Sequence, residues 1–338
     1  MVWNLILSIS LIQISNDGAS GNSPAVNENT VNGFTTDVTE VISNTQGSVV
    51  TIVAKTEESE RRSSGIIYGN EENAIYILTG SDILENTQTV AVRFDSGIEL
   101  PATVVGRDKT AKVGLLRLEP PFDTLAIKLG DSGLISQGEY VIAMGGRRTD
   151  TESAMVTFGV AGTPGERQLN SSSTWTCDVI ESDIIVTSND IGGPLLNISG
   201  ELLGMIVTTP MGGSPSMGYA ISVNELRLIY AQLKEGRDVQ RGALGTTVRS
   251  INTLRAYQKS ARNIRLDMTT GVLITNILAD SAAYGILKEG DVLDTIDGET
   301  IRDAFDLRTR LYAHKEGDTV QFGIIREGAS ASVSVVLQ

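Results

Sequence analysis

The chain has 338 residues, of which 41% are hydrophobic, and its formal net charge is −14. A chain of this length accommodates two or three domains of about 100–200 residues each, and its apolar content suffices for packed cores. The negative excess lies entirely before Arg241, because 12 basic and 12 acidic residues follow from there, so the sequence offers no basic stripe to nucleic acid or anionic lipid.

Two scarce residue types narrow the chemistry. Cys177 is the single cysteine, which excludes an intramolecular disulfide and an all-cysteine metal site, and we expect a small, semi-buried apolar side chain there. His314 is the single histidine, and it precedes Lys315-Glu316-Gly317, a pattern typical of the last turn of a helix stopped by glycine. We therefore expect no metal site and no cofactor. A histidine-based triad in the first two-thirds of the chain would require the far domain to reach over.

The N-terminal segment predicts a location outside the cytoplasm. Residues 1–16 carry no charge and are rich in Leu and Ile. As a helix they would reach about 24 Å, short of the roughly 30 Å hydrocarbon core, and no basic segment precedes them. We interpret them as a signal or anchor remnant, with a buried amphipathic strand or helix as the alternative. Residues 17–37 are rich in Gly, Asn, Ser and Thr and predict a flexible tether to a domain that is membrane-anchored or exported, at a bacterial cell surface or in the periplasm.

From residue 38 onward, short β-rich runs alternate with turn signals. Evenly spaced runs without a helical period indicate a closed antiparallel barrel rather than alternating strands and helices. A second set of runs begins near residue 140, so the sequence predicts a mostly-β fold with two successive barrels. The first set is 48–53, 65–68, 74–79, 90–94, 102–105 and 113–118, and the second includes 140–144, 155–160 and 218–221.

The stretch 183–197 carries the strongest sign of a functional site. An apolar run feeds a polar corner and then Gly192-Gly193-Pro194, which neither a helix nor a central strand accepts. Such a loop suits a nucleophile, because glycines let a substrate approach the backbone and neighbouring N–H groups can converge on an oxyanion. The nucleophile itself is missing. A helical stretch, 224–235, follows this second set of runs and ends at Gly236.

The stretch 183–197 resembles the region around the active serine of HtrA/DegP-family trypsin-like serine proteases, where an Asp and a short apolar run precede Asn-x-Gly-Asn-Ser-Gly-Gly-Pro-Leu. The family serine falls on Ile191, the residue before it on Asp190, and the glycine before that on Asn189. These three residues form the oxyanion loop that the resemblance implies. In the family that glycine presents its N–H from an unusual backbone conformation, and asparagine tolerates positive φ well, so we expect the loop to keep its shape.

Two further stretches extend the resemblance over the first barrel. Residues 77–84 resemble Ile-Leu-Thr-Asn-x-His-Val-Val, with Asp82 in the place of the catalytic histidine. Residues 108–118 resemble the run around the catalytic aspartate, with Lys112 in that aspartate's place. The resemblance implies a trypsin-like double β-barrel over residues 38–235, with its site in the cleft between the barrels and all three triad positions altered.

The altered positions predict a pseudoprotease. Serine-protease hydrolysis needs a hydroxyl nucleophile, a base to take its proton and a third group to orient that base. Ile191 has no nucleophilic group, and a carboxylate at Asp82 is a poor base with no hydroxyl to serve. Two alternatives stay open: a weak or unconventional serine endopeptidase with Lys112 as base, and a non-catalytic partner subunit of an HtrA-type oligomer. Candidate hydroxyls for the endopeptidase are those of Ser81, Thr187 and Ser188.

Asp82 and Lys112 occupy places that face each other in the fold that the resemblance implies. Either ion alone in a partly buried cleft would be costly, and contact between the two largely offsets that cost. We therefore expect a relic ion pair. The alternative is that both charges turn to solvent without touching.

Residues 241–338 resemble a PDZ domain of the HtrA type, with matching parts at 271–277, 281–283, 287–298 and 317–320. The resemblance implies that the loop Gly242-Ala243-Leu244-Gly245 offers backbone N–H groups to a peptide's C-terminal carboxylate. The peptide then adds as a strand beside Thr246 and Val248, against a helix near residues 305–312. Such a groove prefers an apolar last residue, and the small Ala243 predicts a shallow floor. The alternative is a PDZ domain used only for packing.

These inferences combine into one expectation. The chain is expected to bind peptides or unfolded protein segments with apolar C-termini, as an adaptor, scaffold or regulator in protein quality control outside the cytoplasm. The resemblance also implies a possible homo-oligomer, a trimer in the family. No nucleic-acid partner is expected.

Overall fold

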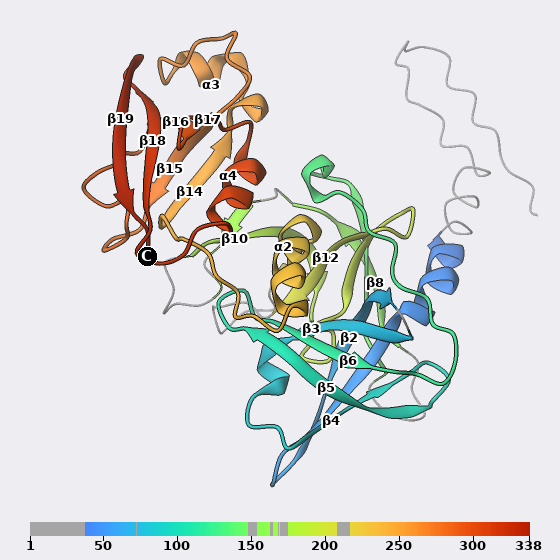
Figure 1. The fold of residues 1–338 in the computed structure, drawn as a ribbon. Coiled ribbons are helices and arrows are strands. Elements are labelled where there is room, and N and C mark those ends of the chain that lie inside the picture. Colours follow the sequence, from blue (N-terminus) through green and yellow to red (C-terminus); the bar gives the residue numbers. More distant parts are fainter. Residues whose placement is uncertain are drawn as a thin grey trace, which may run out of the picture.

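The computed structural model describes residues 38–338 apart from 72, 148–153, 163–164, 168, 170–174 and 208–216. The hydrophobic segment 1–16 and the tether 17–37 lie outside the described residues. Within the described part of the chain, no helix is both long enough and apolar enough to cross a bilayer. Figure 1 shows three successive units, with helix α2 between the first two and the third.

The first unit is the predicted six-stranded barrel, which the structure confirms. Its strands are all antiparallel and close in the order β1-β2-β3-β6-β5-β4. β-Branched and leucine side chains fill the interior, and Gly65 makes room for Ile52 and Ile77, since a Cβ there would lie 2.8 Å from Ile52 Cδ1. The strands are β1 (Val49–Lys55), β2 (Glu60–Glu71), β3 (Ala74–Gly80), β4 (Thr89–Arg93), β5 (Glu99–Asp108) and β6 (Val113–Leu118).

The second unit is a curled antiparallel sheet rather than a fully bonded second barrel. Strand β8 approaches β10 at one isolated bridge, between Ala161 and Ser182. The Asp183 side chain prevents a longer ladder there, because its Oδ1 accepts the Val160 backbone N–H at 2.7 Å in place of a main-chain carbonyl. In sheet order the strands are β8 (Val156–Val160), β7 (Tyr140–Met144), β11 (Pro194–Asn197), β12 (Leu202–Val207), β13 (Met217–Ser222), β10 (Cys177–Ile185) and β9 (Gly165–Arg167).

Helix α2 (Val223–Lys234) confirms the helix predicted after the second set of strands. Ser222 caps it by accepting the Glu225 backbone N–H at 3.2 Å, and Gly236 at a φ of 69° follows its end. Its apolar face is buried, and Leu233 Cδ2 lies 2.9 Å from where a Cβ on Gly106 would stand. The absence of a side chain at Gly106 therefore lets α2 pack closely against β5 of the first barrel.

The third unit is the PDZ sheet, in the order β14-β15-β16-β18-β19 with β17 paired to β16. The helix predicted near residues 305–312 is α4 (Ala304–Leu311). His314 lies beyond it, in a turn where its ring nitrogens are 3.6 and 3.7 Å from carboxylates of Asp297 and Asp318, so the prediction that it ends the helix is wrong. The other elements are β14 (Thr246–Ser250), α3 (Ala256–Ser260), β15 (Val272–Ile277), β16 (Val292–Ile296), β17 (Glu299–Thr300), β18 (Thr319–Arg326) and β19 (Ala329–Val336).

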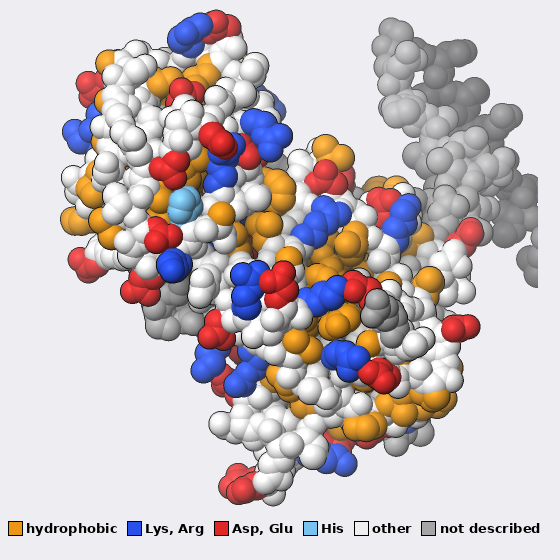
Figure 2. Space-filling view, viewed as in Figure 1, with side chains coloured by type: hydrophobic (Ala, Val, Ile, Leu, Met, Phe, Trp, Pro, Cys, Tyr) orange, Lys and Arg blue, Asp and Glu red, His pale blue; other side chains and the backbone are white. Residues whose placement is uncertain are grey.

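Short 3₁₀ turns complete the structure, and one core connects its parts. The turns are η1 (Gln46–Ser48), η2 (Ser81–Leu84), η3 (Ser132–Leu134) and η4 (Ile251–Thr253), and residues 38–45 form a further helix. The largest cluster of buried apolar side chains runs from Val49 in the first barrel through α2 to Leu337 in the PDZ unit. On the face shown in Figure 2, acidic and basic side chains are interleaved around apolar patches.

Candidate functional site

The three positions that the resemblance assigns to the catalytic triad come from three different connections in the first two units. Asp82 lies in η2, directly after β3. Lys112 lies in the turn between β5 and β6, and Ile191 lies in the loop between β10 and β11. The backbone joins two of these connections, because Ser81 N–H donates to the Lys112 carbonyl at 3.0 Å.

Asp82 and Lys112 contact each other. Lys112 Nζ lies 3.4 Å from Asp82 Oδ2, with side chains 22% and 52% exposed for the lysine and the aspartate respectively. The turn that presents the lysine is built by Asp108, whose Oδ1 accepts the N–H groups of Thr110 and Ala111 at 3.0 and 3.2 Å. It holds Lys112 at a φ of 57°, a left-handed conformation that costs a non-glycine residue about 1–3 kcal/mol. The pair is partly open to solvent, so its attraction is screened.

Ile191, which the resemblance aligns with the family nucleophile, brings an apolar side chain to these connections. A Cβ built on Gly80 would lie 2.7 Å from Ile191 Cγ2, so the isoleucine packs against the end of β3, next to η2. The backbone holds it there, because the Ile191 carbonyl accepts from Ser64 N at 2.9 Å and from Ser63 Oγ at 2.6 Å. The three positions therefore converge in one place, but the side chains there are an ion pair and a hydrocarbon.

The oxyanion loop differs from the expected shape. Asn189 has no positive φ, so the expectation that it keeps the family glycine's conformation is wrong. Instead, Asp190 N–H donates to Thr187 O at 3.0 Å, and the buried Asp190 carboxylate accepts from Thr187 N and Oγ1 at 2.8 and 2.7 Å. This local turn satisfies Asp190 within the loop. The backbone N–H groups of Asn189 and Ile191 find no acceptor among the residues that the structure describes.

The hydroxyl groups considered as alternative nucleophiles occupy different environments. Thr187 Oγ1 donates to Asp190 Oδ2, which fixes its proton on a carboxylate. Ser81 is buried as the first residue of η2, whereas Ser188 is exposed in the loop between β10 and β11. Ser81 directly precedes Asp82, whereas Thr187 and Ser188 belong to the loop that carries Ile191, so the three hydroxyl groups come from two different connections.

The loop Gly242-Ala243-Leu244-Gly245, which is expected to bind a carboxylate, uses two of its N–H groups within the domain itself. Gly242 N–H donates to Leu311 O at 2.9 Å, and Ala243 N–H donates to Gln338 O at 2.7 Å. Only the N–H groups of Leu244 and Gly245 lack an acceptor among the described residues. Gly245 has a φ of 70° and lies against Ser281, so this position requires glycine. Of the four N–H groups in the predicted loop, two are thus available to a ligand.

The groove beside that loop is already occupied. Glu166 of β9 accepts the Val248 N–H at 2.9 Å, and Thr176, just before β10, donates its hydroxyl to Thr246 O at 3.3 Å. These are the two strand-edge groups beside which a peptide was expected to pair. The space that remains is about 20 Å³, room for one water molecule. Its walls are Glu166, Trp175, Thr176, Leu244, Gly245, Thr246, Val248, Ala304, Leu307, Arg308 and Leu311, and Ala243, the expected floor, is not among them.

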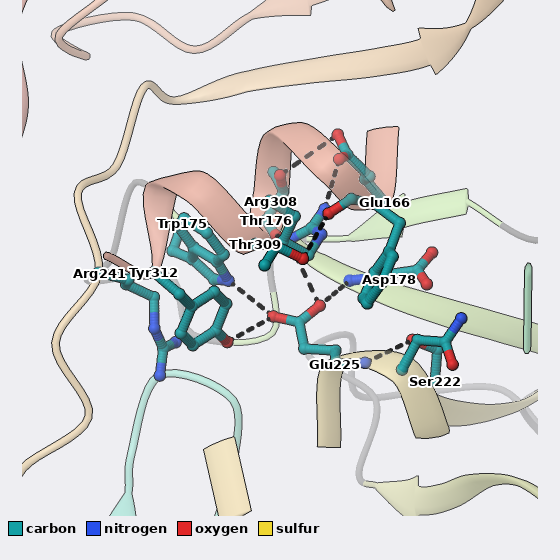
Figure 3. Close-up of polar contacts among 12 residues, drawn as sticks. Glu166, Trp175, Thr176, Asp178, Ser222, Glu225, Arg241, Arg308, Thr309 and Tyr312 are labelled. Carbon is teal, nitrogen blue, oxygen red and sulfur yellow. Dashed lines mark hydrogen bonds and ion pairs between the residues drawn. The ribbon is translucent and has the colours of Figure 1, made fainter. Parts of the chain in front are cut away.

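A buried charge network holds this arrangement together (Figure 3). Arg308 of α4 forms ion pairs with Glu166 and with Glu225 of α2, the latter at 3.3 Å, and donates to Thr176 O at 2.6 Å. Glu225 accepts from Trp175 Nε1 at 3.0 Å and from the Tyr312 hydroxyl at 2.9 Å. We call the state in which Glu166 and Thr176 occupy the groove the closed arrangement. Because the charges are paired and hydrogen-bonded, they tolerate burial.

A second buried ion pair ties the interdomain linker to the turn that carries Lys112. Arg241 pairs with Asp108, and their side chains are 6% and 4% exposed. The Arg241 guanidinium lies 5.3 Å from the ring centre of Trp175 and 5.1 Å from that of Tyr312. Cation–π contacts thus replace the hydrogen bonds that its Nε and Nη1 lack among the described residues. This pair joins the first barrel, the second unit and the PDZ unit at one point.

Burial raises the pKa of two carboxyl groups and one thiol at this junction. Burial raises the pKa of Glu166 to about 7, although Arg308 and the Val248 N–H act to lower it. Burial also raises the pKa of Asp178, and it raises the pKa of the Cys177 thiol well above its usual value. Cys177 is fully buried, so its thiol is an inert core group rather than the semi-buried one expected. Glu166, Asp178 and the Cys177 thiol therefore favour their neutral forms more than they would in water.

Sequence reasoning did not find Glu166, Thr176, Glu225 or Arg308. A weak signal existed for Glu225, which stands three residues after Ser222 in a helix-capping pattern but among apolar positions of α2. Nothing local marked Glu166 or Thr176. Among the described residues, no group of three or more His, Cys, Asp or Glu side chains could hold a metal ion.

Comparisons with known proteins agree with this fold. The trypsin-like peptidase domain family matches residues 63–205, and the PDZ domain family matches residues 242–337. The periplasmic serine endoprotease DegP of Salmonella typhimurium is 29% identical over 78% of this chain and 54% of its own length. The serine protease Do-like HtrA of Lactobacillus helveticus is 29% identical over 83% of this chain and 69% of its own. The chain thus spans about half the length of the DegP relatives, 54% and 56% for two of them.

A solved structure of the HtrA-type protease AlgW with tripeptide has a similar fold. It covers 89% of this chain and 97% of its own, with a TM-score of 0.61 at 24% sequence identity. The order of the two domains and these sequence matches give the chain the domain organisation of HtrA/DegP proteins, a trypsin-like peptidase domain followed by a PDZ domain.

Proposed function

We propose that this chain is a pseudoprotease that binds peptides or unfolded protein segments outside the cytoplasm. The observation that carries the proposal is the packing of Ile191 against Gly80, at the place where the family nucleophile stands. An isoleucine there can neither attack a carbonyl nor donate a proton. Asp82, in the base position, pairs with Lys112 rather than with a hydroxyl group.

The loop that carries Ile191 retains hydrogen-bond donors for a peptide that is bound but not cut. The N–H groups of Asn189 and Ile191, which have no acceptor among the described residues, can donate to a peptide carbonyl. Binding of this kind needs hydrogen-bond donors and an accessible strand edge, but no proton transfer. An adaptor, scaffold or regulator therefore fits these residues better than a hydrolase does.

A casein-cleavage assay and a fluorophosphonate probe test the catalytic part of the proposal. The expected result is neither cleavage nor labelling, with an active HtrA-type protease as the positive control. Casein cleavage by the purified chain, abolished by Lys112→Met, would instead support the unconventional endopeptidase.

The PDZ unit supports the binding part. The solved HtrA-type structures of similar fold are described with a tripeptide or a decapeptide. In this chain the Leu244 and Gly245 N–H groups stand beside the edge of β14, suited to a C-terminal carboxylate. We infer that peptides with a free carboxylate and an apolar last residue bind here, with micromolar or weaker affinity because the closed arrangement competes.

Titration of the full chain with a fluorescent peptide, as free acid and as C-terminal amide, tests this mode. Amidation removes the charge that the loop receives and should abolish binding. Equal curves for acid and amide would leave the PDZ unit as a packing module.

Location and assembly follow the relatives. DegP of Salmonella typhimurium and DegP and DegQ of Escherichia coli are described as periplasmic. We propose an extracytoplasmic location for this chain too, with residues 1–16 as anchor or signal, and a homo-oligomer, by family a trimer. Cell fractionation and light scattering of the purified chain test these two points.

A further inference from the structure

One carboxylate in the closed arrangement is held by two groups of the PDZ groove. Glu166 Oε2 accepts the backbone N–H of Val248, and Glu166 Oε1 pairs with the guanidinium of Arg308. Val248 lies on β14 and Arg308 on α4, the two walls of the groove. The groove therefore contains a built carboxylate site, formed by a strand-edge donor and a buried cation.

The segments that occupy the groove make the same kinds of bond as an added strand. Thr176 supplies a donor to Thr246 O, and Glu166 supplies an acceptor to Val248 N–H. An extended peptide beside β14 would use its own N–H and C=O for these two bonds. The protease-like domain thus stands where such a ligand would lie, and the two exclude each other.

Arg308 is the part of the groove that a main chain alone cannot satisfy. Its side chain is 6% exposed, and its partners Glu166 and Glu225 both belong to the protease-like domain. A ligand that displaces this domain removes both carboxylates and leaves the guanidinium beside the apolar side chains of Leu307 and Leu311. A peptide that covers the groove again removes this guanidinium from water, so a ligand that brings its own carboxylate is favoured over one that leaves the cation unpaired.

We propose that the groove between β14 and α4 selects peptides with an Asp or Glu side chain for Arg308, and that Glu166 holds this place in the closed arrangement. The inference rests on the proposed peptide binding and adds the class of ligand: acidic near the C-terminus as well as apolar at its end. Val248 is two residues, about 7 Å of strand, from Thr246 at the loop. The third residue from the peptide's end therefore lies opposite it.

Two single variants of the full chain separate this selectivity from simple opening. Glu166→Gln and Arg308→Gln each remove one partner of the same ion pair, so both should weaken the closed arrangement. Only Glu166→Gln keeps the cation. The chain has two tryptophans, so adding Trp3→Phe to each of the two variants leaves Trp175 as the single tryptophan. Trp175 lies 5.1 Å from Arg308 and bonds to Glu225, so its fluorescence reports opening, and circular dichroism reports folding.

The probes are two fluorescent peptides with the same apolar last residue, carrying Glu or Gln at the third position from the end. In Glu166→Gln the Glu peptide should bind about tenfold tighter than the Gln peptide, the difference expected of one charge-assisted hydrogen bond. In Arg308→Gln that ratio should fall to about one. Arg308→Glu should reverse the preference, binding a Lys peptide over the Glu peptide.

Two results would overturn the proposal. Equal affinities of the Glu and Gln peptides for Glu166→Gln would show that the groove does not recognise the carboxylate of the peptide's Glu side chain. If Arg308→Gln still bound the Glu peptide about tenfold tighter than the Gln peptide, Arg308 would not be the residue that recognises the carboxylate. Failure of every peptide to bind either opened variant would count against peptide binding as a function, and this result differs from a missing preference among peptides that bind.

Discussion

At the residue scale, two ion pairs of this chain illustrate how burial decides the energetic role of a charge. Asp82 and Lys112 touch at 3.4 Å but remain partly exposed, whereas Arg241 and Asp108 are almost fully buried. Solvent screens the first pair, and its residues retain some hydration when separated. The buried pair lacks this hydration, because a charge that loses its partner there stays out of water. Mutations of the two pairs should therefore differ in their effects on the free energy of unfolding.

The exposed pair should show a small coupling. A double-mutant cycle with Asp82→Asn and Lys112→Met, followed by chemical denaturation, is expected to give about 0.3–1 kcal/mol. A coupling below about 0.3 kcal/mol would mean that the two charges are effectively solvated despite their contact. Lys112→Met keeps the left-handed backbone strain in place, so the cycle reports the charge pair alone.

The buried pair should behave asymmetrically. Arg241→Met leaves Asp108 buried and unpaired and should cost about 3–5 kcal/mol of unfolding free energy. The double change with Asp108→Asn should cost clearly less than the sum of the singles, because it leaves neither charge buried without its partner. Asn can still accept the Thr110 and Ala111 N–H groups through Oδ1, so the turn itself is kept. Additive losses in urea unfolding would contradict a direct pair. The exposed pair serves as the matched control.

Restoring the nucleophile alone should not restore hydrolysis. Ile191→Ser supplies a hydroxyl group. Asp82 still stands in the place of the histidine base, and Lys112 in the place of the aspartate that would orient that base. We expect no casein cleavage from Ile191→Ser, and at most a trace from the triple change Asp82→His, Lys112→Asp, Ile191→Ser. The activity of the triple variant is limited further because Asn189 lacks the positive φ expected for the oxyanion loop. Robust cleavage by the single variant would show that another base is present.

At the element scale, the PDZ unit docks through one helix and one strand edge. Helix α4 places Arg308 and, at its C-terminal end, Tyr312 toward Glu225 of α2, as Figure 3 shows. Strand β14 presents Thr246 and Val248 to the protease-like domain. The contacts are polar and buried rather than purely apolar, which makes docking specific in register and sensitive to the loss of any member.

At the scale of the whole molecule, the closed arrangement should depend on pH. The pKa of Glu166 is about 7 when it is buried, against 4.5 as its ordinary value, so closing takes up a proton between these values. Raising the pH from about 5 to about 7 should therefore weaken closing, and above that range this group has no further effect. Asp178, whose pKa burial also raises, acts in the same direction.

The groups that face Glu166 from the packed elements are Arg308, Asp178, Glu225 and the Val248 N–H. Trp175 fluorescence of the Trp3→Phe chain, or peptide affinity across this pH range, measures the effect. Peptide binding should strengthen as the pH rises, and Glu166→Gln should flatten most of the profile. A profile unchanged by Glu166→Gln would assign the pH dependence to other groups.

Local sequence determined much of this protein. Short β-rich runs and the turn residues between them predicted the strands of the first barrel to within a few residues, because these signals act over neighbouring positions. The Gly-Gly-Pro corner and its flanking residues located Ile191, and the runs around Asp82 and Lys112 located the other two positions. Those identities alone predicted that the family chemistry is altered.

The tertiary structure decided what the sequence left open. The Glu166–Val248 bond spans 82 positions and the Glu166–Arg308 pair spans 142, so no local pattern marks either contact. Asparagine tolerates positive φ, but Asn189 does not adopt it. The hydrogen bonds between Thr187 and Asp190 fix the loop in a different turn. Sequence periodicity encodes which residues face a core, whereas the packing of distant elements determines which charges meet and which strand edge stays open.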